Sequence, residues 1–234
     1  MTTVNQVLQQ LQAKADPEQL EGMARYGMTT DNRMGVKVPE MRKIAKKVGK
    51  NHQLALELWD TGIAEARIVA SLVDDPALVS EVQMDDWVAG FNSWDVCDQV
   101  CMNLFDKTPY AWLKLSEWST RKPEYEKRAA YALIAVLAVH DKGARDEQFS
   151  ELLPLIKAGA DDGRNYVKKA VSWALRNIGK RSPQLRGEVL DFLPELEAMQ
   201  NKTASWIARD TFRDLNSDAT KRRMARMGDG ELLC

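Results

Sequence analysis

Four segments of the chain resemble one another, and their repetition constrains the fold more than any other feature of the sequence. They read EARIVASLV (65–73), EKRAAYALIAVL (126–137), YVKKAVSWALRNI (166–178) and TASWIARDTFRDL (203–215). Each is rich in alanine, carries a cation early or in the middle, and follows a shorter helical segment that ends in a turn. The last three begin about 40 residues apart, a period typical of repeats built from paired helices. We therefore expect an all-α solenoid that buries one helix of each pair and leaves a concave surface for partners.

The local signals are helical along the chain. Glycine and proline lie mostly between periodic segments, and no convincing run of alternating β-branched residues indicates a strand. Segment 129–139, AAYALIAVLAV, is apolar on all sides, as expected of an inner helix that is covered on both sides. The predicted helices span roughly residues 3–14, 17–26, 39–49, 51–59, 63–72, 76–80, 82–89, 94–105, 109–117, 123–140, 146–157, 164–180, 183–195 and 201–215.

These helices divide the chain into a folded part and a tail. We expect residues 1–216 to form one HEAT-like solenoid domain with a concave basic face. Residues 217–234 are expected to form a basic, flexible tail, because they follow the last repeat and contain KRRMAR (221–226). Solenoids of this kind are often monomers, so we expect a monomer.

The bulk composition excludes several classes of protein. Lysine plus arginine total 33 and aspartate plus glutamate total 34, so only a segregated positive face could indicate nucleic-acid binding. Three cysteines do not make a disulfide framework and indicate a reducing compartment. The apolar run 129–139 is too short to span a bilayer, and the N-terminus lacks a basic and then apolar signal region. We therefore expect a soluble cytoplasmic protein without membrane contact.

Motifs for several common catalytic chemistries are missing from the sequence. Its two histidines, His52 and His140, lie far apart without ligand-like spacing, so we expect no metal site. There is no P-loop, GxGxxG or GxSxG motif, and no histidine-based triad can be assembled. Cys97 and Cys101 have no adjacent histidine and lie on an apolar helix face, so we interpret them as core. A hydrolase here would work with carboxylate, arginine and tryptophan, and we expect no cofactor.

Residues 92–101, NSWDVCDQVC, begin a predicted helix with a tryptophan and two carboxylates. On a helical wheel, Trp94 and Asp98 lie together on the shoulder of the apolar face, about 40° apart. Asp95 lies opposite that face, and we interpret it as a first-turn acid that interacts favourably with the helix dipole. Asp98 has two interpretations, a pair with a buried arginine or a functional carboxylate, and the helix alone does not decide between them.

The segment 164–181, RNYVKKAVSWALRNIGKR, contains six cations and no acid. Trp173 lies outside the apolar face of this predicted helix and shares a stripe, at spacings of 4, 3 and 4 residues, with Lys169, Arg176 and Lys180. A tryptophan between cations fits contact with a nucleic-acid backbone beside an aromatic platform. In the alternative interpretation Trp173 packs on a neighbouring helix and the cations are only solvated. This helix alone leaves both interpretations open.

Other cations are less specific. Arg128 begins the apolar helix, where it either reaches the same surface as the other helix starts or forms a structural ion pair, for instance with Asp98. The basic runs RKIAKKVGK (42–50) and KRRMAR (221–226) are each more often a solvated face or a tail than a binding site.

The chain resembles the AlkD-type DNA alkylation-repair glycosylases, which are built from HEAT-like repeats. The resemblance covers most of the chain, from MARYGM (23–28) and GVKVPEMRKIAK (35–46) to VSWALRNIGKRSP (171–183). Its most specific parts are SWDxxD (93–98), KRAA (127–130) and the SWALR segment. In this family a tryptophan and an aspartate four residues later open one helix, an arginine opens a later helix, and a second tryptophan lies on the helix after that. These positions are matched by Trp94, Asp98, Arg128 and Trp173.

The resemblance implies a monofunctional glycosylase that removes N3- or N7-alkylated purines, such as 3-methyladenine or 7-methylguanine, from duplex DNA. Such a base is cationic and departs as a neutral purine, so no proton donor is needed. Asp98 would stabilise the positive charge developing on the sugar and position the attacking water. Trp94 and Trp173 would border the sugar, and Arg128 would hold a phosphate next to the lesion.

The resemblance also implies a wider contact with DNA. The flanking phosphates would be held by Lys169, Arg176 and Lys180 and by the 42–50 run with Arg42, Lys43 and Lys46. The protein would then be associated with the nucleoid when it acts on DNA.

Two other functions stay open at this point, a non-catalytic nucleic-acid-binding repeat protein and a protein-interaction scaffold. Asp98 distinguishes a glycosylase from the first alternative, because a protein that only binds nucleic acid gains nothing from a carboxylate that faces phosphates. The cations beside Trp173 distinguish it from the second alternative, because a protein-interaction scaffold predicts no segregated cations there.

Overall fold

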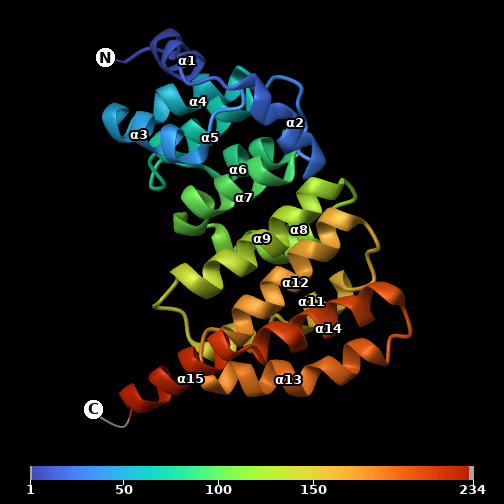
Figure 1. The fold of residues 1–234 in the computed structure, drawn as a ribbon. Coiled ribbons are helices and arrows are strands. Elements are labelled where there is room, and N and C mark those ends of the chain that lie inside the picture. The colour runs from blue at the N-terminus through green and yellow to red at the C-terminus, as the bar shows by residue number, and fades with distance from the viewer. Residues whose placement is uncertain (1, 232–234) are drawn as a thin grey trace. The chain divides into compact units, whose positions relative to one another are not determined.

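The computed structural model describes residues 2–231, and the chain divides into two compact units, Met1–Trp112 and Leu113–Cys234. All regular elements of the described residues are helices, which confirms the predicted all-α class (Figure 1). None of these helices is long and apolar enough to cross a membrane. The single domain over 1–216 stays a prediction.

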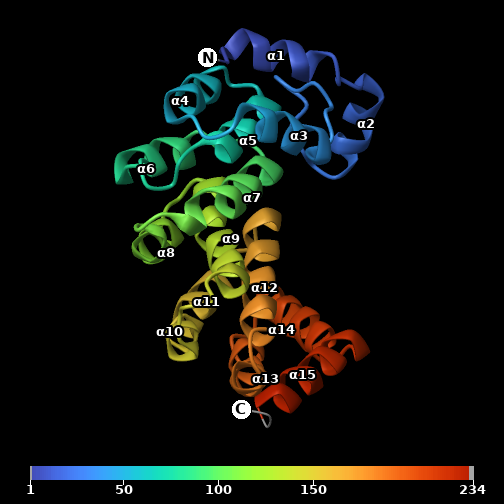
Figure 2. The same cartoon turned by 90° about the vertical axis from the view of Figure 1, so that its left-hand side faces the viewer.

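The first unit stacks its helices in order. α1 packs on α3, α3 on α5 and α5 on α7, while α4 covers α5 (Figure 2). Its core includes Trp59 and Trp87, whose rings stack with centroids 4.1 Å apart. The elements are α1 (Val4–Gln12), α2 (Pro17–Arg25), α3 (Val38–Val48), α4 (His52–Asp60), α5 (Ala64–Val73), α6 (Glu81–Ala89), α7 (Trp94–Asn103) and the 3-10 helix η1 (Phe105–Lys107), followed by α8 (Ala111–Ser119) at the boundary.

The second unit is built around three helices that lie side by side, α9, α12 and α14 (Figures 1 and 2). α11 and α13 pack against α12, and α13 also packs on α14. Every residue of α9 from Arg128 to Ala138 is buried, which confirms the predicted inner helix except at the last residue of the apolar segment, Val139, which is exposed. The elements are α9 (Glu124–His140), α10 (Asp146–Ser150), α11 (Leu153–Gly159), α12 (Asn165–Gly179), α13 (Pro183–Glu197), α14 (Lys202–Leu215) and α15 (Asp218–Glu231).

The approach of α11 to α9 depends on a glycine. The phenol of Tyr131 on α9 is buried and donates a hydrogen bond to the carbonyl of Leu155 at 3.3 Å. A Cβ added at Gly159 would lie 2.2 Å from the Tyr131 Oη, so only glycine fits this position without a shift of the ring or the helix. Burial raises the pKa of Tyr131, which keeps the phenol neutral.

Two of the predicted helices are wrong in detail. Residues 76–80 do not form a helix, because Asp75 closes a turn in which its side chain accepts a hydrogen bond from the backbone N–H of Ala77 at 3.1 Å. The predicted helix 146–157 is two helices, α10 and α11. Pro154 lies in the first turn of α11, where a proline is well tolerated but cannot donate the hydrogen bond that a continuous helix needs.

Part of the segment predicted to be a flexible tail is helical. Asp218–Glu231 form α15, which packs on α13 and α14. The hydroxyl of Ser217 accepts a hydrogen bond from the backbone N–H of Thr220, and Thr220 and Met224, one turn apart, are buried. These two side chains anchor α15, while the cations of the run 221–226 are exposed. Residues 232–234, which include Cys234, lie outside the described residues.

Candidate nucleic-acid site

α7 carries the first two predicted site residues. Trp94 is the first residue of α7, and Asp98 lies one turn later; both side chains are partly exposed. The indole Nε1 of Trp94 donates a hydrogen bond to the carbonyl of Tyr26, just after α2, at 3.1 Å. The core face of α7 is fully buried and consists of Val96, Cys97, Val100 and Cys101. Trp94 and Asp98 therefore share the edge of a helix whose other side is fixed in the core.

The two cysteines of α7 belong to that core. Cys97 and Cys101 are not joined in a disulfide and have no exposed surface. Burial raises the pKa of the Cys101 thiol well above its ordinary value, and the neighbouring Cys97 adds to the effect. A thiol that stays protonated is a poor nucleophile, so the interpretation of these cysteines as core is confirmed.

Asp95 is held by a partner that sequence reasoning missed. It lies in the first turn of α7, as the dipole interpretation requires, but its carboxylate also accepts two hydrogen bonds from Arg33, at 2.7 and 2.9 Å. The hydroxyl of Ser93 donates a third, at 2.5 Å. The dipole is therefore only part of the role of Asp95. Arg33 is 62 residues away in a polar loop, where no local pattern indicates that it is buried.

A buried carboxylate on α5 positions the loop that carries Arg33. Glu65 has no exposed surface and accepts hydrogen bonds from three consecutive backbone N–H groups, those of Met34, Gly35 and Val36, at 3.1, 2.8 and 3.2 Å. Gly35 has φ +78°, a left-handed conformation that favours glycine. Because this carboxylate fixes the backbone directly after Arg33, the guanidinium is held at the start of α7.

In the second unit, Arg128 is almost completely buried. Its side chain lies in the second turn of α9, with 5% of the residue exposed, and Nη1 donates to the carbonyl of Tyr166 at 2.5 Å. The backbone N–H of Tyr166 in turn donates to Glu124 at 3.1 Å, and the Tyr166 ring stacks on Tyr125 with centroids 5.6 Å apart. Arg128 thus belongs to a set of contacts that joins the start of α12 to α9.

Trp173 lies at the edge of the buried face of α12. It is partly exposed, whereas Val167, Ala170, Val171 and Ala174 have no exposed surface. Lys169, one turn before it, is exposed and forms no ion pair with the described residues. An indole and a solvated ammonium group therefore occupy adjacent turns of one helix.

The other two cations of this stripe are paired. Arg176 lies 3.5 Å from the carboxylate of Asp210, and Lys180 lies 3.0 Å from that of Asp214. Both acids belong to α14. The spacing of residues along α12 does not predict these partners, because both acids lie on another helix further along the chain. We define the α12 stripe as Lys169, Trp173, Arg176 and Lys180.

The three predicted cations of α3 lie on a different part of the first unit. Lys43 and Lys46 line a groove of about 680 Å³ between α1 and α3, and Lys43 also pairs with Glu40 at 2.5 Å. Arg42 is exposed on the same helix. All residues that line the groove come from α1, α3 and the two residues after α1, and none comes from the edge of α7 that carries Trp94 and Asp98.

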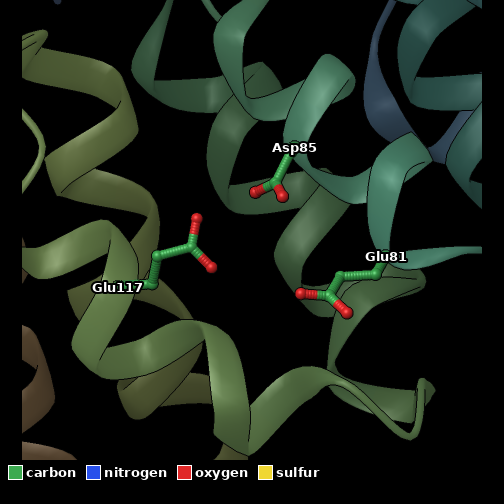
Figure 3. Close-up of side chains that lie close together, drawn as sticks. All are labelled: Glu81, Asp85 and Glu117. Carbon is green, nitrogen blue, oxygen red and sulfur yellow. The ribbon is translucent and has the colours of Figure 1, made fainter.

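Figure 3 shows three further acidic side chains, Glu81 and Asp85 of α6 and Glu117 of α8. Glu81 lies in the first turn of α6, where a carboxylate interacts favourably with the helix dipole. Glu117 pairs with Lys114 at 2.7 Å and also with Arg121. These interactions do not exclude a metal ion, so the absence of a metal site stays a prediction.

Comparisons with known proteins extend this description. The model of a family described as DNA alkylation repair enzyme matches residues 7–225. One similar solved structure comes from a new family of proteins that is related to the HEAT-like repeat DNA glycosylases and has affinity for branched DNA structures. It has a TM-score of 0.74 and 22% identity, over 83% of this chain and 83% of that one. This likeness confirms the HEAT-like repeat fold.

Two further comparisons give no information about fold or function. A designed armadillo repeat protein in complex with a (KR)4 peptide matches with a TM-score of 0.35 and 15% identity, over 97% of this chain and 88% of that one, which supports no inference. No curated protein matches the chain.

Proposed function

The chain belongs to the DNA alkylation repair enzyme family, and we propose that it is a monofunctional DNA glycosylase that excises cationic N3- or N7-alkylated purines from duplex DNA. The observation that carries the proposal is the position of Asp98, one turn after Trp94 on the partly exposed edge of α7. A protein that only binds DNA gains nothing from an anion on a surface that meets phosphates, because like charges repel. A glycosylase gains from it directly.

Removal of an alkylated purine requires a negatively charged side chain rather than a proton donor. An alkylated purine already carries a positive charge, so it leaves as a neutral base when the bond between C1′ and the base nitrogen breaks. The electron pair goes to the base, and positive charge develops on the deoxyribose. The carboxylate of Asp98 stabilises that charge and positions the water that adds to C1′, and the added water then loses a proton to solvent. This requirement agrees with a chain in which no histidine lies at the candidate site.

The two tryptophans would border the sugar. Their electron-rich faces favour a neighbouring cation, and both side chains are partly exposed. The hydrogen bond from Trp94 to the carbonyl of Tyr26 fixes one indole, and the Arg33–Asp95 pair fixes the helix start that carries it. Trp173 takes the corresponding role on α12.

The cations would hold the backbone of the DNA. The guanidinium of Arg128 has five N–H donors, one of which is used by the carbonyl of Tyr166. Because only 5% of the residue is exposed, a phosphate next to the lesion would accept from Arg128 at that exposed edge. Lys169 is already solvated, whereas Arg176 and Lys180 exchange carboxylate partners for phosphates. Arg42, Lys43 and Lys46 contact phosphates further away. In this proposal the protein acts as a monomer, without a cofactor, on DNA in the cytoplasm.

A second candidate function is binding of branched DNA without base excision. It is favoured by the described affinity of the similar solved structure for branched DNA. It uses the same cations but assigns no role to Asp98, so binding alone does not separate the two candidates.

A base-release assay separates them. The protein is incubated with duplex DNA that carries 7-methylguanine, and the free base is measured while binding is followed in the same sample. We expect release from this duplex and none from an undamaged one. If the damaged duplex is bound but no base appears, and a four-way junction is bound more tightly than either duplex, the second candidate replaces the first.

A further inference from the structure

The α12 stripe has a second copy on α14. The first copy reads, at spacings of 4, 3 and 4 residues, Lys169, Trp173, Arg176 and Lys180. The second has the same spacings, 33 residues further along the chain, in Lys202, Trp206, Arg209 and Arg213. We call the second set the α14 stripe. The first three positions are identical and the fourth is a cation in both, a closer match than the loose similarity of the helices as a whole.

The structure repeats the same local geometry in both stripes. The Nε of Arg176 donates to the carbonyl of Ser172 at 3.3 Å, and the Nε of Arg209 donates to the carbonyl of Ser205 at 3.1 Å. Each arginine therefore folds back along its own helix toward the preceding tryptophan position. The two arginines therefore make the same side-chain hydrogen bond to the carbonyl four residues earlier.

The two stripes also lie on adjacent helices in contact. α12 packs on α14, and the hydroxyl of Ser172 donates to Asp210 at 2.7 Å. The ammonium group of Lys168 lies 4.8 Å from the centroid of the Trp206 ring. This cation–π contact, together with the Ser172–Asp210 hydrogen bond, holds the face of α14 that carries Trp206 against α12.

The cations of the α14 stripe are more available to a partner than those of the α12 stripe. Arg176 and Lys180 are partly buried beside acids of α14. By contrast, Lys202 and Arg209 are exposed and form no ion pair with the described residues, and Arg213, which pairs with Asp210, keeps 80% of its side chain exposed. Solvated cations attract a polyanion without first losing a carboxylate partner.

We propose that the α14 stripe is a second contact site for the phosphate backbone of duplex DNA, next to the contact at the α12 stripe. This inference rests on the proposed function, since it extends the same DNA-binding face. Packed helices lie about 8–10 Å apart, which corresponds to about three base-pair steps of about 3.4 Å each. A strand that crosses from α12 to α14 therefore meets the second stripe about three base pairs from the first.

The binding test compares two charge-reversal variants. Lys202→Glu/Arg209→Glu removes the two unpaired cations of the α14 stripe. Lys142→Glu/Arg145→Glu makes the same charge change at two exposed cations after α9, outside both stripes. Affinity for an undamaged duplex is measured by fluorescence anisotropy at several salt concentrations, and thermal melting confirms that both variants are folded.

We expect the α14-stripe variant to bind at least about 10-fold more weakly and to lose about two units from the slope of log affinity against log salt, one for each phosphate contact. The control variant should keep the wild-type slope. If both variants weakened binding equally, the change in net charge alone would explain the result and the proposal would be overturned. Wild-type affinity of the α14-stripe variant would overturn it as well.

A second measurement locates the contact. Single phosphates of the duplex are replaced one at a time by uncharged methylphosphonates, and each duplex is bound to the wild-type protein and to the α14-stripe variant. A neutral linkage that weakens binding of the wild type, but not of the variant, marks the phosphate that the stripe contacts. The absence of any such position overturns the proposal.

Base release distinguishes this inference from the proposed function. Release of 7-methylguanine by the wild-type protein is therefore measured alongside the binding comparison. If the wild type releases no base while the stripe variant still binds more weakly, the glycosylase proposal fails and the contact site stands.

Discussion

The guanidinium of Arg33 and the carboxylate of Asp95 form two parallel hydrogen bonds, from Nη1 to Oδ2 at 2.7 Å and from Nη2 to Oδ1 at 2.9 Å. The side chain of Arg33 is only 2% exposed and that of Asp95 is 15% exposed. Because the loop after Arg33 is fixed by the buried Glu65, this pair ties the first turn of α7 to α5. Trp94, directly before Asp95, is thereby held on a rigid element.

Loss of this pair should destabilise the protein. Asp95→Ala leaves Arg33 charged, nearly buried and without its carboxylate, and removal of one partner of a buried pair costs about 3–5 kcal/mol. We expect the free energy of unfolding to fall by about 3 kcal/mol, at the lower end of this range, because Asp95 keeps some contact with water. Urea unfolding measures the difference. The control is Asp86→Ala, an exposed acid on α6, which should stay within about 0.5 kcal/mol of the wild type; an equally small effect of Asp95→Ala would contradict a structural role for the pair.

The sequence predicted the helices well because helical signals are local. Apolar periodicity and helix-start residues such as Ser182 before Pro183 lie within one or two turns of the backbone they control. The predicted helix at 76–80 failed because the turn chemistry of Asp75 outweighs a short helical pattern. α15 was missed because its anchor is only two buried side chains, Thr220 and Met224, within a run of cations.

The residues that form ion pairs with side chains of the candidate site were less predictable from the sequence. Trp94, Asp98 and Trp173 were singled out because helical spacing places them beside apolar faces. The ion pairs of Asp95 with Arg33 and of Arg176 with Asp210 join residues from separate elements, and nothing in the local spacing of either residue indicates the other. Tertiary packing alone brings these charges together, so a sequence without an aligned relative does not reveal them.

Gly159 should tolerate no side chain, in contrast to a glycine on a neighbouring helix. A Cβ at Gly159 would lie 2.2 Å from the Oη and 2.4 Å from the Cζ of Tyr131, so Gly159→Ala forces α11 and α9 apart and should cost about 1–3 kcal/mol. A Cβ at Gly187 in α13 meets nothing within 4 Å, so Gly187→Ala should stabilise the protein by about 0.5–1 kcal/mol through helix propensity. Thermal unfolding measures both. If both substitutions changed the free energy of unfolding in the same direction, the close contact at Gly159 would be contradicted.

Replacement of Trp173 should separate function from fold. Trp173 is partly exposed, so Trp173→Ala should cost less than about 1.5 kcal/mol while base release from a 7-methylguanine duplex falls. Trp87, buried and stacked on Trp59 at 4.1 Å, is the comparison, and Trp87→Ala should cost about 3–5 kcal/mol. Urea unfolding and base release are measured for both variants. If Trp173→Ala unfolds as readily as Trp87→Ala, Trp173 is a core residue and its contact with the sugar is refuted.

Asp98→Asn tests the mechanism most directly. The amide keeps the size and hydrogen-bonding capacity of the side chain but removes the charge that stabilises the sugar cation, so base release should fall by about 100-fold or more. Affinity for the damaged duplex should stay the same or rise, because an anion near phosphates is removed. Asp86→Asn, at an exposed position of α6, provides the matched change of charge and should leave both quantities unaltered. Single-turnover release and anisotropy are measured together. An Asp98→Asn protein that is folded, binds the duplex and releases base at the wild-type rate would show that Asp98 is structural.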